Sequence, residues 1–144
     1  MDRGELDTYL AEPRNAVLAS VNTQNAPVQV PVFFDWHNGK AYVSVTSQRG
    51  FFPNFARNPN VALCIDDQGP PMRTVLIRGD VAVIEGDAIW PHTERIIHKY
   101  RSGQEAVDSL ERMRGEPRVI LQITPSAITS WSPTPRDRDI WRAE

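Results

Sequence analysis

Hydroxyl and arginine side chains gather in residues 44–59, S-V-T-S-Q-R-G-F-F-P-N-F-A-R-N-P, where an alternating strand pattern gives way to a helical one. Thr46 and Ser47 offer two hydroxyl groups, and Arg49 offers a planar guanidinium that suits phosphate or carboxylate. The helix that follows would present unpaired backbone N–H groups with partial positive charge. This combination predicts an anion-binding site. The alternative interpretation is that Ser47 caps the helix and Arg49 lies in solvent.

Other motifs with recognisable chemistry are missing from the sequence. It contains no P-loop, no G-x-G-x-x-G and no G-x-S-x-G. His92-Thr93-Glu94 matches half of a zinc deaminase signature, but the P-C-x-x-C half is absent. With three histidines and one cysteine in the chain, we expect no metal site. No residue stands out as a catalytic acid, base or nucleophile, so the catalytic residues stay unknown at this point.

The composition is that of an ordinary globular domain. The 144 residues are 40% hydrophobic and 24% charged, and the net charge is −2. This balance gives no long-range attraction for nucleic acid, and no apolar run reaches the roughly 18 residues that a membrane span needs. We therefore expect a single domain over residues 1–144 that works in the cytoplasm, without nucleic acid or membrane as a partner.

Short strand patterns dominate the sequence around these residues. The predicted strands are 14–22, 26–35, 40–47, 61–65, 72–85 and 117–124, and the predicted helices are 4–12, 51–58, 91–101 and 103–114. Asn38-Gly39 predicts a type I′ hairpin turn, and Gly79 in the longest strand predicts a bulge or a sharp bend. Six mostly consecutive strands predict a mainly β fold, a small antiparallel barrel with a few helices. A Pro-rich tail with Trp131 and Trp141 is expected after the last strand.

Five segments, taken in their order and spacing, resemble a known family. They are N-A-V-L-A-S-V-N-T-Q-N-A-P-V-Q-V-P-V-F-F at 15–34, W-H-N-G-K-A-Y-V-S-V-T-S at 36–47, P-N-F-A-R-N-P-N-V-A-L at 53–63, I-R-G-D-V-A-V-I-E at 77–85 and I-T-P-S-A-I-T-S-W at 123–131. Together they resemble the flavin and deazaflavin oxidoreductases whose fold is the six-stranded antiparallel split β-barrel of the pyridoxamine-5′-phosphate-oxidase type. The resemblance spans most of the chain.

The resemblance implies an oxidoreductase that binds F420 or FMN and transfers a hydride to or from a small organic substrate. It also implies a homodimer with its cofactor sites at the subunit interface. In this family the strand-to-helix junction holds the cofactor phosphate, which implies binding roles for Thr46, Ser47 and Asn54, with Arg49 as a cation. The second strand would lie against the cofactor ring through Val28, Val30 and Val32.

One position departs from the family pattern. The family commonly has a lysine three residues before the helix asparagine, and here that position is Phe51. A phenylalanine cannot neutralise a phosphate, although Arg49 could supply the cation instead. Two alternatives to the enzyme therefore stay open. One is a non-catalytic protein that carries a flavin or deazaflavin, and the other is an interaction module on the same fold that has lost its cofactor.

Overall fold

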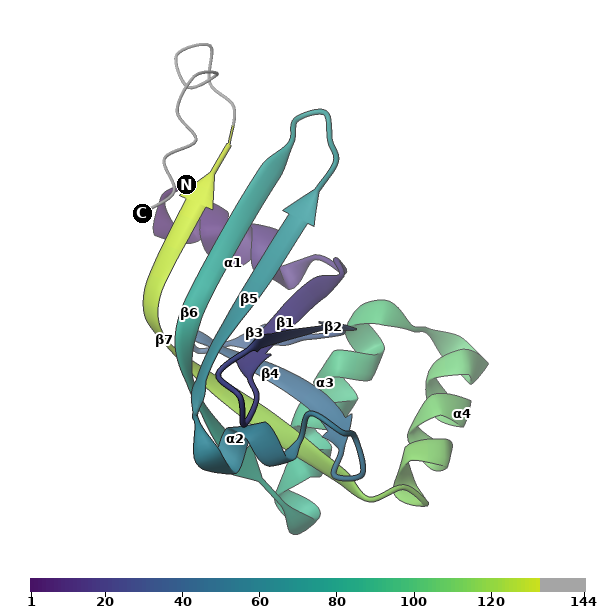
Figure 1. Ribbon diagram of the computed structural model, residues 1–144. Coiled ribbons are helices and arrows are strands. Elements are labelled where there is room, and N and C mark those ends of the chain that lie inside the picture. The colour runs from purple at the N-terminus through teal and green to yellow at the C-terminus, as the bar shows by residue number, and fades with distance from the viewer. Residues whose placement is uncertain (133–144) are drawn as a thin grey trace.

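The computed structural model describes residues 1–132; residues 133–144, with Trp141, lie outside the described part. Within residues 1–132, one antiparallel sheet is accompanied by short helices (Figure 1). The elements are α1 (Arg3–Ala11), β1 (Ala16–Val21), β2 (Pro27–Val32), β3 (Asp35–His37), β4 (Lys40–Thr46), α2 (Pro53–Arg57), β5 (Asn60–Asp67), β6 (Arg73–Ile84), the 3-10 turn η1 (Gly86–Ile89), α3 (Trp90–Tyr100), α4 (Gly103–Arg114) and β7 (Arg118–Trp131). Among these residues, no helix has the length and apolar character required to cross a lipid bilayer.

The sheet is curled because its two outermost strands are neighbours in the sequence. The strand order is β2-β1-β5-β6-β7-β4-β3, so β2 and β3 lie at opposite edges. Only Phe33 and Phe34 separate them. Three trans peptide steps span at most about 11 Å, which forces the end of β2 and the start of β3 close together. The predicted mainly β, antiparallel split barrel is confirmed.

The described sheet has seven strands where the sequence pattern predicted six, because the chain bends at Phe34. The pattern suggested one strand over 26–35, but β2 ends at Val32. The backbone N–H of Phe34 donates to the Tyr100 hydroxyl at 3.3 Å, and the single proton of that hydroxyl is directed to the Arg14 carbonyl at 2.5 Å. The backbone of Phe34 thus bonds to a side chain instead of to a neighbouring strand. The predicted Asn38-Gly39 turn, with φ values of 51° and 74°, then joins the short β3 to β4.

The bulge predicted at Gly79 is present and lets the last strand run further than expected. The register of β6 against β7 shifts between Arg78 and Gly79, and Gly79 pairs with Pro125. Proline has no N–H to donate, but at a bulge this loss does not end the ladder. The strand predicted at 117–124 therefore continues to Trp131, which pairs with Thr74.

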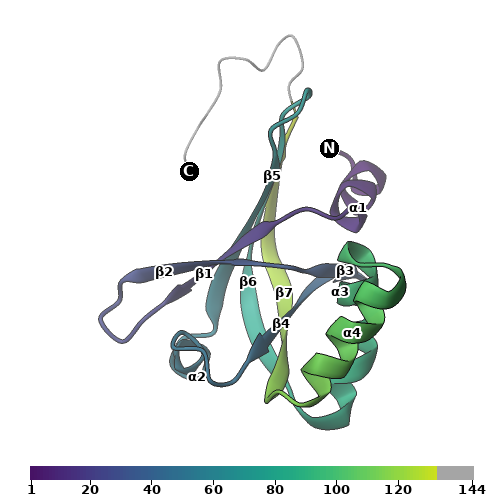
Figure 2. The same cartoon turned by 90° about the vertical axis from the view of Figure 1, so that its right-hand side faces the viewer.

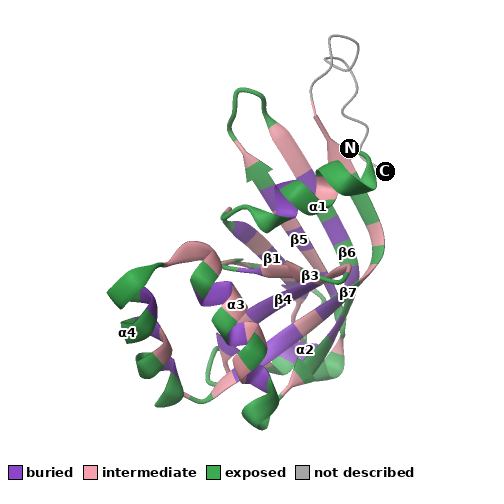
Figure 3. Cartoon of the chain, turned by 180° about the vertical axis from the view of Figure 1, so that it is seen from behind, coloured by how far each residue is buried: buried purple, intermediate pink, exposed green. Residues whose placement is uncertain are grey.

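Apolar side chains cover both faces of β4. Ala41, Val43 and Val45 point into the barrel core, which α1 and α2 also help to fill. On the opposite face, Tyr42 packs with Ile96 of α3 in a second cluster. Helix α3 thus lies against the outside of the barrel, and α4 packs on α3 (Figure 3). From the side, the β1–β2 hairpin projects away from these two helices (Figure 2).

Candidate functional site

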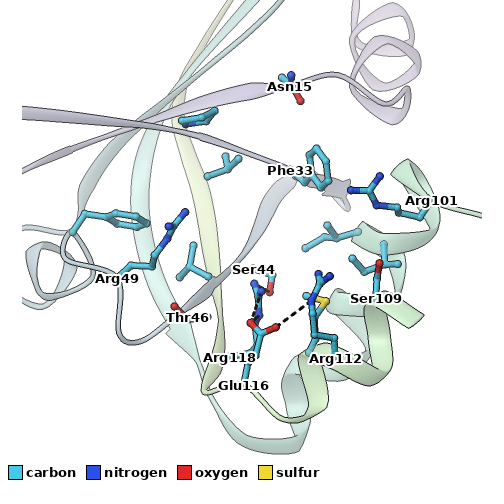
Figure 4. Close-up of a pocket in the computed structure, with 17 residues that line it drawn as sticks. Asn15, Phe33, Ser44, Thr46, Arg49, Arg101, Ser109, Arg112, Glu116 and Arg118 are labelled. Atoms are coloured by element: carbon cyan, nitrogen blue, oxygen red, sulfur yellow. Dashed lines mark hydrogen bonds and ion pairs between the residues drawn. The ribbon is translucent and has the colours of Figure 1, made fainter. Parts of the chain in front are cut away.

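A cavity of about 510 Å³ lies between the barrel and the α3–α4 pair (Figure 4). Its volume is in the range of small-molecule and cofactor sites. The barrel contributes Asn15, Pro31, Val32, Phe33, Ser44, Val45, Thr46, Arg49, Phe51 and Arg118. The two helices and the loop after them contribute Ile96, Ile97, Arg101, Ser109, Arg112, Met113 and Glu116.

The cavity is positively charged although the chain carries a net charge of −2. Arg49, Arg101, Arg112 and Arg118 line it, and Glu116 is the one acidic residue among the lining residues of the described chain. The arginines come from the β4–α2 loop, the end of α3, α4 and the start of β7. Partial enclosure strengthens such a field, because less water screens the charges. The arrangement suits a ligand with an anionic group.

Arg49 is held at the cavity by its own turn and by an aromatic ring. Its backbone N–H donates to the Thr46 carbonyl at 3.2 Å, which closes the turn after β4. Its guanidinium carbon lies 5.8 Å from the ring centroid of Phe51. Phe51 in turn makes an edge contact with the buried Phe55, with centroids 6.0 Å apart. Phe51 therefore anchors the loop to the core and supports the cation.

Arg118 reaches the cavity because β7 pairs with β4. In this antiparallel register Arg118 lies directly opposite Thr46, so the two side chains share one face of the sheet. Its Nη1 lies 3.4 Å from the Ser44 hydroxyl, and its Nη2 donates to Glu116 Oε2 at 2.7 Å. The arginine is therefore fixed next to the two hydroxyl groups at the end of β4.

Tyr100 and Lys99 lie behind the cavity wall and hold α3 in place. The Tyr100 ring stacks on Phe33 with centroids 4.0 Å apart, and its hydroxyl donates to the Arg14 carbonyl at 2.5 Å. Burial raises the pKa of Tyr100 to about 12. The Lys99 ammonium donates to the Leu10 carbonyl at 2.7 Å, and burial lowers the pKa of Lys99 to about 8. These groups do not line the cavity, so their role is to position the wall.

The cavity brings together three of the residues predicted from the sequence: Thr46, Arg49 and Val32. Val28 and Val30 occupy the same partly buried side of β2 as Val32 but lie outside the lining. Ser47 is exposed, and its backbone N–H donates to the Pro117 carbonyl at 2.9 Å.

Asn54 is buried beneath the loop, where its Nδ2 donates to the Ser20 hydroxyl at 3.4 Å. It supports α2 instead of lining the cavity. The helix predicted at 51–58 is shorter, because α2 spans Pro53–Arg57. No side chain caps its start, so the alternative that Ser47 is the cap is wrong. The other half of that alternative agrees with the structure, since Arg49 is exposed, although it also lines the cavity. The backbone N–H groups of Asn54 and Phe55 already donate to the carbonyls of Phe51 and Phe52, so the predicted row of unpaired N–H groups is largely occupied.

The sequence prediction missed the helical side of the cavity and the start of β7. Arg101, Arg112, Glu116 and Arg118 follow Arg49 by 52 to 69 positions and belong to elements that carried no recognised motif. The one local signal is the density of charge in R-M-R-G-E-P-R at 112–118, just where a helix ends and a strand begins.

Comparisons with known proteins agree with this architecture. The family model described as pyridoxamine 5′-phosphate oxidase matches residues 3–132. No curated protein matches the sequence. A conserved hypothetical protein from Mycobacterium tuberculosis superposes with a TM-score of 0.80 at 18% identity, covering 92% of this chain and 85% of the other.

Two further solved structures are similar to this chain in fold. An F420 reductase has a TM-score of 0.65 at 22% identity, covering 85% of this chain and 94% of that one. A heme storage protein from Vibrio cholerae has a TM-score of 0.69 at 14% identity, covering 90% and 93%. At these identities the likeness shows the fold alone. The match of the family model over most of the chain shows that this protein belongs to the pyridoxamine 5′-phosphate oxidase family.

Proposed function

We propose that this protein is an oxidoreductase that binds FMN or F420 in the arginine-lined cavity and exchanges a hydride with a small organic substrate. The observation that carries the proposal is that four arginines line this one cavity, in a member of this family. Thr46 and Arg49 would hold the cofactor phosphate. Val32, Phe33 and Ile96 would supply apolar surface for a flat ring system.

The residues of the cavity fit such a cofactor. Guanidinium groups bind phosphate with charge-assisted hydrogen bonds, and they cluster on the same cavity as the apolar side chains. The bound cofactor would supply the hydride chemistry. The protein's own contribution would be to orient the ring, to exclude water along the apolar wall and to neutralise the phosphate.

The first experiment is a visible absorption spectrum of the purified protein, followed by fluorescence titration of the stripped protein with FMN, F420 and riboflavin. We expect saturable binding of FMN or F420 at micromolar concentration or tighter. Riboflavin, which lacks the phosphate, should bind at least about tenfold more weakly, because it loses charge-assisted contacts. A protein that binds none of these ligands would contradict the proposal.

A non-catalytic carrier is the second candidate function. It is favoured by the lining itself: among the described residues it contains no histidine, cysteine, lysine, tyrosine or aspartate, and its one glutamate is ion-paired. A reaction here would draw its protons from solvent or from the cofactor. An enzyme should oxidise its reduced cofactor faster when substrate is added, and a carrier should not. Failure to bind any cofactor would instead favour the interaction module.

We also expect a homodimer in the cytoplasm, as the family resemblance implies. Light scattering coupled to size-exclusion chromatography should give the mass of a dimer. If the cofactor sites lie at the subunit interface, FMN or F420 should strengthen the dimer. A monomer that binds cofactor with full affinity would contradict this expectation.

A further inference from the structure

The Glu116 carboxylate lies between the guanidinium groups of Arg112 and Arg118, in the position that an anionic ligand could take. Its Oε2 accepts from Nε and Nη2 of Arg118 at 3.1 and 2.7 Å. Its Oε1 lies 3.4 Å from Nε of Arg112, on the other side. Each carboxylate oxygen therefore faces a different guanidinium, and all three side chains line the cavity (Figure 4). We call these three residues the α4–β7 corner.

The corner is partly sheltered and has further polar groups within reach. The side chains of Arg118 and Glu116 are 17% and 27% exposed, so this pair is less screened by solvent than a surface ion pair. The Ser44 hydroxyl lies 3.4 Å from Nη1 of Arg118, and Thr46 lies opposite Arg118 on β4. Two guanidiniums with hydroxyls beside them form a donor set for phosphate or carboxylate.

We propose that the α4–β7 corner is a binding subsite for a phosphate or carboxylate group of a bound molecule, and that Glu116 is its internal competitor. Glu116 belongs to the three-residue loop between α4 and β7, and its backbone is held by bonds to Met113 and Arg118. Its side chain can rotate away while the backbone stays in place. An internal carboxylate acts at an effective concentration of about millimolar or above, so only a ligand with further contacts in the cavity displaces it.

This arrangement makes Glu116 a determinant of ligand charge. A neutral ligand leaves the ion pairs of Glu116 with Arg112 and Arg118 intact and gains no binding energy from these arginines. An anionic ligand takes the place of the Glu116 carboxylate, so each guanidinium again faces a negatively charged group. The inference rests on the proposed function for the identity of the bound molecule. Anion binding itself is tested without any cofactor.

The test is calorimetric titration of inorganic phosphate into the wild-type protein and into Glu116→Gln. The amide keeps an oxygen that can accept from Arg118 but removes the negative charge. We expect phosphate to bind at least about tenfold more tightly to Glu116→Gln than to the wild type. The matched control is Glu111→Gln, because Glu111 is exposed on α4 and lies outside the lining. It should leave phosphate affinity unchanged.

A second variant tests whether the increase in phosphate affinity arises at the α4–β7 corner. Adding Arg112→Gln to Glu116→Gln should remove most of the gain, and the 68% exposed Arg112 side chain can be replaced with little risk to folding. Equal phosphate affinity of wild type and Glu116→Gln would overturn the inference, as would a gain that survives loss of Arg112. Binding of FMN and F420 is measured separately, so failure of this inference is distinguishable from failure of the proposed function.

Titration of FMN and riboflavin into the same variants then identifies the anionic group. If the corner takes the cofactor phosphate, Glu116→Gln should tighten FMN but not riboflavin, and phosphate should compete with FMN. If it takes an anionic substrate, FMN affinity should stay the same and phosphate should bind beside FMN. Both results support an anion subsite, and they differ in which molecule occupies it.

Discussion

Arg49 is the cavity arginine that makes no ion pair with any described residue. Its neighbour is the ring of Phe51, whose attraction for a cation at an exposed site is about 0.5–1 kcal/mol. This contact orients the guanidinium without neutralising it. Its charge therefore remains available to a phosphate, which makes Arg49 the first residue to test.

Arg49→Ala should weaken binding of FMN or F420 by about 1.5–3 kcal/mol, because one charge-assisted contact to the phosphate is lost. Fluorescence titration measures the change. Arg57→Ala is the control, since Arg57 is exposed on α2, bonds to the Asn22 carbonyl and lies outside the cavity. An unchanged dissociation constant in Arg49→Ala would remove this residue from the phosphate site.

Phe51→Lys restores the lysine of the family pattern at the cavity. If the phosphate lies beside Arg49, the added ammonium should tighten FMN or F420 binding by about tenfold. The matched control is Phe52→Lys, because Phe52 makes a similar edge contact with Phe55, at 6.3 Å, but does not line the cavity. If both variants lose affinity to the same extent, the aromatic packing of the loop matters more than its charge.

At the scale of elements, the β6 bulge shapes the end of the barrel. A Cβ atom added at Gly79 would lie 2.2 Å from the Thr124 carbonyl oxygen and 2.9 Å from its carbon. These are backbone atoms of the paired strand, so β7 would have to move. The close approach of β6 and β7 at this point therefore requires a glycine.

Gly79→Ala should lower the free energy of unfolding by about 1–3 kcal/mol or more, measured by urea denaturation. Gly50→Ala is the control, because a Cβ atom there meets nothing within 4 Å and its φ is not positive. It should leave stability the same or raise it slightly. Equal stability of both variants would show that β7 moves away from the bulge without penalty.

At the scale of the whole molecule, Lys99 joins the helical layer to the first helix. Its ammonium bonds to the carbonyl of Leu10 in α1 and lies 3.7 Å from the ring centroid of the buried Phe34. Burial disfavours the charged form, so the native pKa of about 8 lies below the ordinary value of 10.5. Between these two pH values the unfolded chain holds a proton that the native protein has released. The contribution of Lys99 to stability therefore rises with pH in this window.

We expect the wild-type protein to gain stability relative to Lys99→Met as the pH rises from 8 to 10. Urea unfolding of both proteins at a series of pH values measures the difference. Above pH 10 the buried Tyr9 and the half-buried Tyr100, whose pKa values are raised to about 12, lower the stability of the native protein as the pH rises, so the comparison ends there. Parallel stability curves over this range would show that Lys99 is not desolvated in the native protein.

The fold could be predicted from the sequence because its signals are local. Alternating apolar residues, the Asn38-Gly39 turn and the glycine at position 79 each act within one strand or hairpin. Their order along the chain already predicted an antiparallel barrel. The seventh strand was missed because Phe34 leaves the ladder to pair with Tyr100, 66 residues away, and no local pattern marks such a contact.

The candidate site could be predicted only in part. By itself the sequence determined the family of the protein. It also determined that Thr46 and Arg49 lie at the junction after β4. Only the tertiary structure decided the charge of the cavity, because the antiparallel pairing of β4 with β7 sets Arg118 opposite Thr46. Packing of α3 on the barrel and of α4 on α3 then brings Arg101 and Arg112 to the same cavity. The electrostatic field of the cavity depends on the distances between charges in space. The separation of two residues along the chain does not reveal those distances.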